Sequence, residues 1–187
     1  QIAQTMAYAH SQGVIHRDLK PLNVMVGAFG EVQVMDWGLA KRLSGIKGPQ
    51  QPMRIGIPSV ATLDSTAEQV ETAMQPADTD QDHRTQEGQI LGTPAYMPPE
   101  QARGELARLD ERCDVFALGA ILCEILTGRP PYIGYDKNDV FDKATKADLK
   151  DTWQRLESSG ADVDLITLAK DCLAPDPDVR SRHAGIV

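Results

Sequence analysis

Three oxygen-bearing side chains near the start of the sequence have types and spacing suited to phosphate chemistry. Asp18 and Asn23 fall within one polar loop, and Asp36 follows thirteen residues after Asn23. Mg²⁺ takes oxygen ligands, commonly one or two carboxylates together with substrate phosphates, which suits Asn23 and Asp36. Asp18 lies five residues before Asn23, where its side chain can accept a proton from a hydroxyl nucleophile. Lys20 would hold a transferring phosphate as a point charge.

Each of these residues also has an ordinary structural interpretation. An isolated aspartate such as Asp18 is more often a cap or turn residue, and Asn23 and Asp36 are common turn formers beside strands. An isolated lysine is usually a solvated surface group. The chemical interpretation therefore depends on these residues occurring together. We interpret His10 as a surface or helix-end residue.

The elements that must position these side chains are a helix and a β-hairpin. Apolar side chains recur at helical spacing near the start of the chain: Ile2, Met6 and Ala9. Two short strands are expected at Val24–Val26 and Val32–Met35, because the turn between them carries two glycines. A loop and a strand end would thus deliver Asp18, Asn23 and Asp36 to one place.

The C-terminal half is predicted to be helical. Residues 114–127 are apolar on nearly all sides of a helix, so this helix is expected to be central and buried, and Gly128 ends it. Three further helices are marked by apolar residues at helical spacing: Val140, Phe141 and Ala144; Leu149, Trp153 and Leu156; and Val163, Ile166, Ala169 and Cys172. The fold is therefore predicted to be mainly α with a small β-hairpin.

The composition is that of a globular domain or of part of a larger one. The 187 residues are 41% hydrophobic and 25% charged, and the net charge of −8 argues against broad binding to nucleic acid. The three cysteines form no CxxC pair, so we expect reduced thiols in a cytoplasmic setting. No apolar run reaches the length of a membrane helix. The first residue is Gln, and we expect the chain to be a piece of a longer protein.

Residues 44–89 differ in composition from the rest of the chain. They contain no aromatic residue, four prolines, and seven acidic against three basic side chains. Such a segment buries too little apolar surface to offset the entropy of ordering it. We therefore expect residues 44–89 to be a disordered insertion, with a transient helix around residues 65–74.

Five motifs occur in the order found in protein kinases. HRDLKPLN at 16–23 matches the catalytic-loop pattern H-R-D-L-x-x-x-N, and DWG at 36–38 stands where that family has D-F-G. GTPAYMPPE at 92–100 resembles the stretch that ends in A-P-E, and DVFALG at 114–119 resembles the start of the family's central helix. Arg180 stands where the family has the arginine that pairs with the A-P-E glutamate. The chain thus resembles the C-terminal lobe of a eukaryotic-type protein kinase, and most of all the bacterial Ser/Thr kinases.

The resemblance implies a role for each candidate residue. Asp18 resembles the catalytic base, and Asn23 and Asp36 resemble the metal ligands. Lys20 resembles a γ-phosphate contact, and Thr93 would hydrogen-bond near Asp18 and help to seat the substrate hydroxyl. The implied cofactors are ATP and Mg²⁺, with Mn²⁺ as an alternative metal. The implied full domain is α+β and two-lobed.

Other residues are expected to support the site. Glu100 and Arg180 are predicted to form a structural ion pair. Asp114 is predicted to accept backbone N–H bonds from the catalytic-loop motif. His16 is interpreted as structural, packing near Trp37.

Regulation by phosphorylation is a further hypothesis. Arg17, next to Asp18, marks a kinase type in which an arginine cluster often captures a phosphate on the activation loop. The sixth residue before Thr93 is Glu87, and Thr85 lies two residues earlier. We hypothesise that Thr85 is a phosphoacceptor, or that Glu87 supplies part of the charge.

The sequence departs from the family pattern in the nucleotide-covering lobe. It contains no G-x-G-x-x-G motif and no V-A-I-K-like lysine. Residues 1–187 are therefore interpreted as a partial kinase domain, a C-lobe without its N-lobe, that is inactive on its own. Trp37 replaces the family's Phe, and Pro98 replaces the Ala of A-P-E.

Three functions remain open on the sequence alone. The leading one is an ATP-dependent protein Ser/Thr kinase, and the alternative is a catalytically inactive kinase-like binding or scaffold module. A small-molecule phosphotransferase is the third, although such relatives usually lack the Lys20-Pro21 pair and the 92–100 stretch. The expected partner is a protein substrate and not a nucleic acid, and no membrane segment is expected in this chain, although the parent protein could be anchored. The sequence makes no prediction about oligomeric state.

Overall fold

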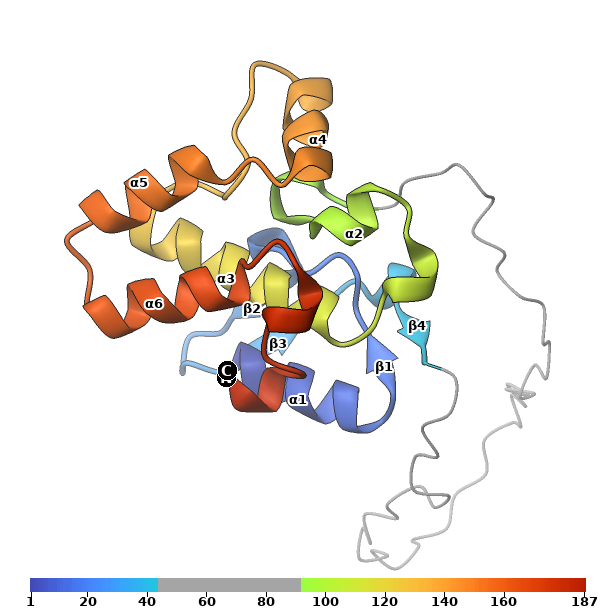
Figure 1. Ribbon diagram of the computed structural model, residues 1–187. Helices are drawn as coiled ribbons and strands as arrows, with labels where there is room; N and C mark the ends of the chain where they lie inside the picture. Colours follow the sequence, from blue (N-terminus) through green and yellow to red (C-terminus); the bar gives the residue numbers. More distant parts are fainter. Residues whose placement is uncertain (44–91) are drawn as a thin grey trace, which may run out of the picture. The chain divides into compact units, whose positions relative to one another are not determined.

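The computed structural model describes residues 1–43 and 92–187. The expected insertion at 44–89 lies outside the described residues, as do Thr85 and Glu87. Within the described part of the chain, helices predominate and the strands are short (Figure 1). The prediction of a mainly α fold with a small β-hairpin is therefore confirmed.

Helix α3 (Arg112–Thr127) is the centre of the packing. It lies against α1 (Ile2–Ser11), α5 (Lys150–Ser158) and α6 (Val163–Cys172) (Figure 1). Gly128 ends α3 in a left-handed conformation at φ 73°, which glycine adopts without a steric penalty. The helix predicted at 114–127 is thus present, and it begins slightly earlier, at Arg112.

Opposite faces of α3 contribute to two apolar clusters. One cluster joins α3 to the C-terminal helices: Met97, Ala102, Phe116, Ala120, Cys123, Tyr132, Ala144, Leu149, Leu156, Ala169 and Leu173. The other joins α3 to α1 and to the N-terminal loop and hairpin: Met6, Ala9, Leu19, Val34, Ala117, Leu118, Ile121 and Ala184. Gly119 lets α3 and α6 approach closely, because a Cβ there would lie 2.5 Å from the Cβ of Cys172. The second cluster anchors Leu19, the residue after Asp18.

The strands form two antiparallel pairs. β2 (Val24–Val26) and β3 (Val32–Val34) form the predicted hairpin, with Val24 opposite Val34. β1 (Val14–Ile15) pairs with β4 (Lys41–Arg42), a contact that the sequence did not predict. This second pair holds the start of the Asp18 loop beside the chain that follows Asp36.

The remaining helices complete the C-terminal part. They are α2 (Pro99–Ala102) and α4 (Lys137–Lys146), together with the 3₁₀ segments η1 (Pro21–Asn23), η2 (Trp37–Leu39), η3 (Pro94–Tyr96), η4 (Leu106–Arg108), η5 (Pro177–Val179) and η6 (Ala184–Ile186). The side chains of Asp136 and Asp162 cap the first turns of α4 and α6. None of the helices in the described residues combines the length and the apolar character that a membrane crossing requires.

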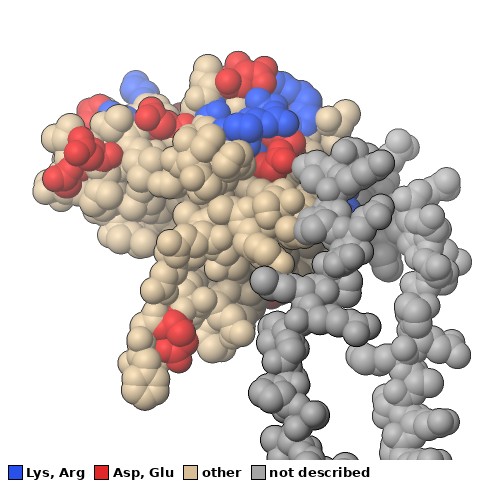
Figure 2. Space-filling model, turned by 90° about the horizontal axis from the view of Figure 1, so that it is seen from below, with Lys and Arg blue, Asp and Glu red and all other residues tan. Residues whose placement is uncertain are grey.

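Charges of both signs lie side by side on the surface. Figure 2 shows basic and acidic side chains gathered next to one another on one face, beside a broad area with few charges. Arg112 contacts the carboxylates of Asp110 and Asp178, and Arg182 contacts Asp110 as well. These basic side chains are therefore largely neutralised by acidic neighbours.

Candidate active site

The loop at residues 16–23 is fixed by a single buried carboxylate. Asp114, in the first turn of α3, accepts the backbone N–H of His16 at 2.8 Å and that of Arg17 at 2.9 Å. Each of its two carboxylate oxygens takes one of these bonds. The central helix thus sets the backbone position immediately before Asp18.

His10 lies at the end of a helix, as one of its two interpretations has it, but it is buried, so the interpretation as a surface residue was wrong. Its Nδ1 accepts the backbone N–H of Ala184 at 3.2 Å, which leaves Nε2 to donate to Asp114 at 3.0 Å. Although His10 lies in the last turn of α1, only 4% of it is exposed. The tertiary contacts of α1 with α3 and η6 bury it, and a single polar residue in a helical pattern does not reveal such contacts.

We expect Asp114→Asn to destabilise the fold and to loosen the 16–23 loop. The amide oxygen can replace only one carboxylate oxygen, and the amide N–H₂ would then face a backbone N–H. Hydrogen bonds to a charged group contribute about 1.5–3 kcal/mol each, so the free energy of unfolding should fall by about 2–3 kcal/mol. Urea denaturation measures this loss. A value within about 0.5 kcal/mol of wild type, the range of ordinary surface substitutions, would show that the carboxylate does not hold the loop.

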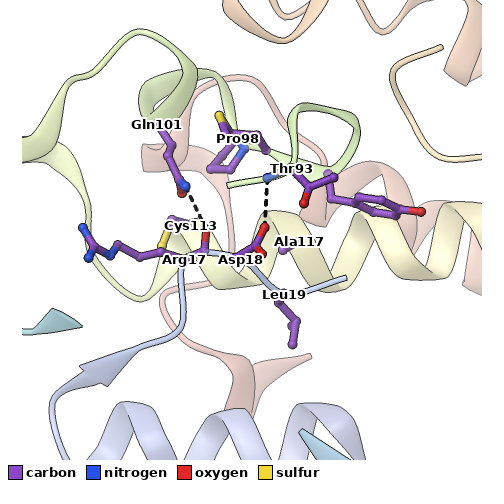
Figure 3. Close-up of a pocket in the computed structure, with 10 residues that line it drawn as sticks. Arg17, Asp18, Leu19, Thr93, Pro98, Gln101, Cys113 and Ala117 are labelled. Atoms are coloured by element: carbon purple, nitrogen blue, oxygen red, sulfur yellow. Dashed lines mark hydrogen bonds between the residues drawn. The ribbon is translucent and has the colours of Figure 1, made fainter. Parts of the chain in front are cut away.

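The Asp18 carboxylate is held in one orientation by two neighbours. Its Oδ1 accepts the backbone N–H of Thr93 at 2.9 Å (Figure 3). Its Oδ2 accepts a bond from Lys20 Nζ at 2.6 Å. The same Lys20 Nζ donates to the Thr93 hydroxyl at 2.7 Å. Asp18 and Lys20 from the 16–23 motif and Thr93 from the 92–100 motif therefore form one connected group that is only partly exposed to solvent.

Asn23 lies directly against Asp18. Its side-chain N–H₂ donates to the Asp18 backbone carbonyl at 2.8 Å and lies 3.4 Å from Asp18 Oδ2. In this orientation the amide nitrogen of Asn23 is bonded to the 16–23 loop, and its amide oxygen points away from that loop. Met35 N–H donates to the Asn23 carbonyl at 2.8 Å, so the hairpin brings the residue before Asp36 beside Asn23.

Asp36 follows the hairpin and lies at the surface. Its backbone is left-handed at φ 57°, and its side chain is exposed. Within residues 1–43 and 92–187, no donor or cation pairs with this carboxylate. The same described residues contain no cluster of three His, Cys, Asp or Glu side chains that would hold a metal unaided. A hard divalent cation fits this set only if Asp36, the Asn23 amide oxygen and phosphate oxygens share it, which is how Mg²⁺ is commonly bound.

His16 and Trp37 join the loop to the chain around Asp36. The two rings lie 4.7 Å apart between centroids. His16 Nε2 donates to the Met35 carbonyl at 2.9 Å, while its Nδ1 accepts the Asp18 N–H at 3.3 Å. Trp37 Nε1 donates to the Val34 carbonyl at 3.1 Å. The buried imidazole therefore links the backbone N–H of Asp18 to the carbonyl of Met35, the residue before Asp36, and it does not face the solvent.

The Arg17 side chain lies along the chain after Trp37. Its Nε donates to the Leu39 carbonyl at 2.5 Å. Burial lowers the pKa of the guanidinium from its ordinary value, and the nearby Asp114 carboxylate opposes this shift. A fully charged guanidinium still results at neutral pH, because the pKa of arginine is so high.

Glu100 and Arg180 form a bidentate ion pair in the interior. Arg180 Nη1 and Nη2 donate to the two Glu100 oxygens at 2.6 and 2.9 Å, and both side chains are almost fully buried. The guanidinium also donates to three backbone carbonyls and lies over the ring of Phe116 at 4.9 Å. All five of its N–H groups therefore have acceptors. This pair braces α2 against the chain near the C-terminus and does not touch Asp18.

Two further side chains near the site were not predicted from the sequence. Gln101 Nε2 donates to the Arg17 carbonyl at 2.7 Å (Figure 3). Tyr96 donates its hydroxyl to Glu124 at 2.7 Å, and its pKa is raised by burial and by the Glu124 carboxylate, so the hydroxyl stays neutral. Both residues lie within the 92–101 stretch. Their polar side chains stand there among apolar and proline residues, and this is the feature of the sequence that could have indicated a buried contact.

Comparison with known proteins identifies the family to which this chain belongs. The family model described as "Protein kinase domain" matches residues 1–55 and 77–186, which is most of the chain. The chain belongs to the protein kinase family. The predicted resemblance is thereby confirmed.

Individual bacterial kinases are similar over most of this kinase chain. Serine/threonine-protein kinase PknD of Protochlamydia amoebophila is 36% identical over 153 residues, which are 82% of the chain and 13% of that protein. Serine/threonine-protein kinase PknB of Mycobacterium leprae is 34% identical over 182 residues, which are 97% of the chain and 23% of that protein. The kinase chain thus spans less than a quarter of the length of these relatives.

Proposed function

We propose that the protein containing this chain is a protein serine/threonine kinase. The observation that carries the proposal is the group around Asp18, in which Lys20 and Thr93 hold the carboxylate and Asn23 holds the backbone. Phosphoryl transfer requires mainly positioning and charge neutralisation, and this group supplies both. The names of the bacterial relatives support the choice of serine and threonine as acceptors.

Each side chain has a role that its contacts support. Asp18 orients the acceptor hydroxyl and takes its proton on a carboxylate oxygen. Lys20 contacts both Asp18 and Thr93, so its ammonium lies beside the acceptor and can neutralise negative charge there. Asn23 and Asp36 would hold Mg²⁺ or Mn²⁺. ATP with its metal ion supplies, when bound, the transferable phosphoryl group.

The proposal includes the organisation of the parent protein. Residues 1–187 would be the C-lobe of a two-lobed domain whose glycine-rich motif and V-A-I-K-like lysine are not in this sequence. Alone, these residues would transfer phosphate poorly or not at all. A cytoplasmic location follows from the use of ATP and is supported by three buried cysteines that form no disulfide. The acceptor would be a protein.

A catalytically inactive binding module is the second candidate. It predicts that the acidic and amide residues have lost their mutual geometry, whereas Lys20, Asn23 and Thr93 each contact Asp18. A small-molecule phosphotransferase is less well supported, because the 92–100 stretch is present and Thr93 contacts Asp18.

Transfer from labelled ATP by the natural full-length protein tests the proposal. We expect Mg²⁺-dependent labelling of serine or threonine in protein acceptors, identified by phosphoamino-acid analysis. No labelling of any acceptor would support the inactive module. Labelling of sugars or antibiotics in preference to proteins would support the small-molecule phosphotransferase.

A further inference from the structure

Gln101 contacts the backbone of the residue that precedes Asp18. It lies in α2 and is 7% exposed, and its Nε2 donates to the Arg17 carbonyl at 2.7 Å. Figure 3 shows this bond beside the bond between Thr93 and Asp18. The two bonds line the same small cavity of about 10 Å³ beneath the Asp18 loop. Gln101 therefore acts on the backbone of the site and not on its carboxylate.

The Arg17 peptide needs such a contact because its backbone is in a costly conformation. Arg17 has φ 68°, in the left-handed region that a residue with a Cβ seldom adopts. A strained residue of this kind persists only where its surroundings hold it. Here the N–H is held by Asp114 and the carbonyl by Gln101. These two bonds together fix the direction in which the chain enters Asp18.

Gly92 makes room for this contact. A Cβ at Gly92 would lie 3.0 Å from Gln101 Nε2 and 3.4 Å from the Arg17 carbonyl oxygen, and the backbone of Gly92 has φ 124°. The next residue, Thr93, donates its N–H to Asp18. The contact between Gln101 and Arg17 thus lies where three segments meet: the Asp18 loop, the chain entering Thr93, and α2.

We infer that Gln101 is a positioning residue for Asp18, holding the left-handed Arg17 peptide so that the Asp18 carboxylate faces Thr93 and the acceptor hydroxyl. The inference rests on the proposed function. It adds a link from α2 to the catalytic geometry that acts through one hydrogen bond to a backbone carbonyl. Loss of that bond would let the Arg17 peptide relax and would turn the carboxylate away.

The test compares two variants of the natural full-length protein. In Gln101→Glu the neutral acid can donate to the Arg17 carbonyl, whereas the ionised carboxylate would meet that carbonyl with a lone pair. The ionisable side chains around the same cavity are Arg17, Asp18, Tyr96 and Cys113. Gln101→Met keeps the length of the side chain and removes the donor at every pH.

The expected results separate positioning from simple folding. For Gln101→Met we expect kcat to fall by about tenfold to a hundredfold, the cost of a small displacement at a reacting centre, with KM for ATP nearly unchanged. For Gln101→Glu we expect kcat relative to wild type to decline as the pH rises, because ionisation removes the donor. Gln154→Glu, on the exposed surface of α5, is the matched control and should follow wild type.

Hydrogen exchange supplies a readout that does not depend on activity. In Gln101→Met, the amides of Asp18 and Thr93 should exchange about tenfold faster, the factor that corresponds to one net hydrogen bond, while those of α3 are unchanged. Wild-type kcat, a wild-type pH profile and unchanged exchange would overturn the inference. Uniformly faster exchange throughout the chain would also overturn it, since Gln101 would then stabilise only the fold. An inactive wild-type protein would refute the proposed function, while the exchange of these two amides would still decide the role of Gln101.

Discussion

Asp18→Asn is expected to lower kcat of the full-length protein by about 10²–10⁴-fold, the usual contribution of a general base. The amide has nearly the shape of the carboxylate, so one oxygen can still accept the Thr93 N–H. The other position then carries an N–H₂ group, which faces the Lys20 ammonium and cannot take a proton from a hydroxyl. The measurement is steady-state transfer from labelled ATP to a protein acceptor.

Two comparisons make this result specific. KM for ATP should change little, because Asp18 contacts the acceptor hydroxyl in the proposed role. Asp171→Asn, an exposed aspartate in α6, removes the same charge at a distance from the site and should leave kcat at the wild-type value. If Asp18→Asn retains more than about a tenth of wild-type kcat, a general base at this position is ruled out.

Glu100→Gln is expected to lower the free energy of unfolding by about 3–5 kcal/mol, because it leaves the buried Arg180 charge without a counterion. The guanidinium is fully buried and cannot turn to solvent, since its other N–H groups are bonded to the carbonyls of Ala174, Arg112 and Pro175. A domain is stable by only about 5–15 kcal/mol, so a loss of this size removes a large part of the total. Chemical denaturation followed by circular dichroism measures it.

An exposed ion pair provides the matched control. Lys170 and Glu157 are 2.7 Å apart, and the Glu157 side chain is 63% exposed. Exposed pairs contribute about 0–1 kcal/mol, so Glu157→Gln should be nearly neutral. Equal effects of Glu100→Gln and Glu157→Gln would contradict the account of the interior pair. Salt should weaken the small effect at Glu157 and leave the effect at Glu100 largely unchanged.

The elements with strong local signals could be predicted from the sequence. Helix α3 is apolar on nearly all sides and ends at Gly128, and the turn of the β2–β3 hairpin carries its glycines. The helices predicted from residues 140–172 are also present as α4, α5 and α6. In each case the pattern lies within one continuous stretch, so period and end signals are sufficient to find it.

The contacts that cross the chain could not be predicted from such patterns. Strands β1 and β4 have two residues each, too few to show alternation, and their pairing requires the whole stretch of residues 16–40 to fold back. Burial of His10 depends on Asp114, which is 104 residues away. The resemblance predicted a hydrogen bond of Thr93 near Asp18, but the bonds from Lys20 to Asp18 and to Thr93 were not predicted.

The phosphorylation hypothesis stays a prediction, because Thr85 lies outside the described residues. The structure does describe the side chain proposed to respond to it. Arg17 donates its Nε–H to the Leu39 carbonyl. Mass spectrometry of the active protein identifies the modified residue directly.

Binding of Mn²⁺ to the nucleotide-loaded full-length protein, followed by electron paramagnetic resonance, tests most directly whether Asn23 and Asp36 hold one metal. Wild-type protein should remove the signal of free Mn²⁺ when nucleotide is present. Asn23→Ala and Asp36→Ala should each weaken Mn²⁺ binding by at least about tenfold, a loss that even outer partners of a metal can cause. Mn²⁺ affinity equal to wild type in both variants, with nucleotide still bound, would contradict the account.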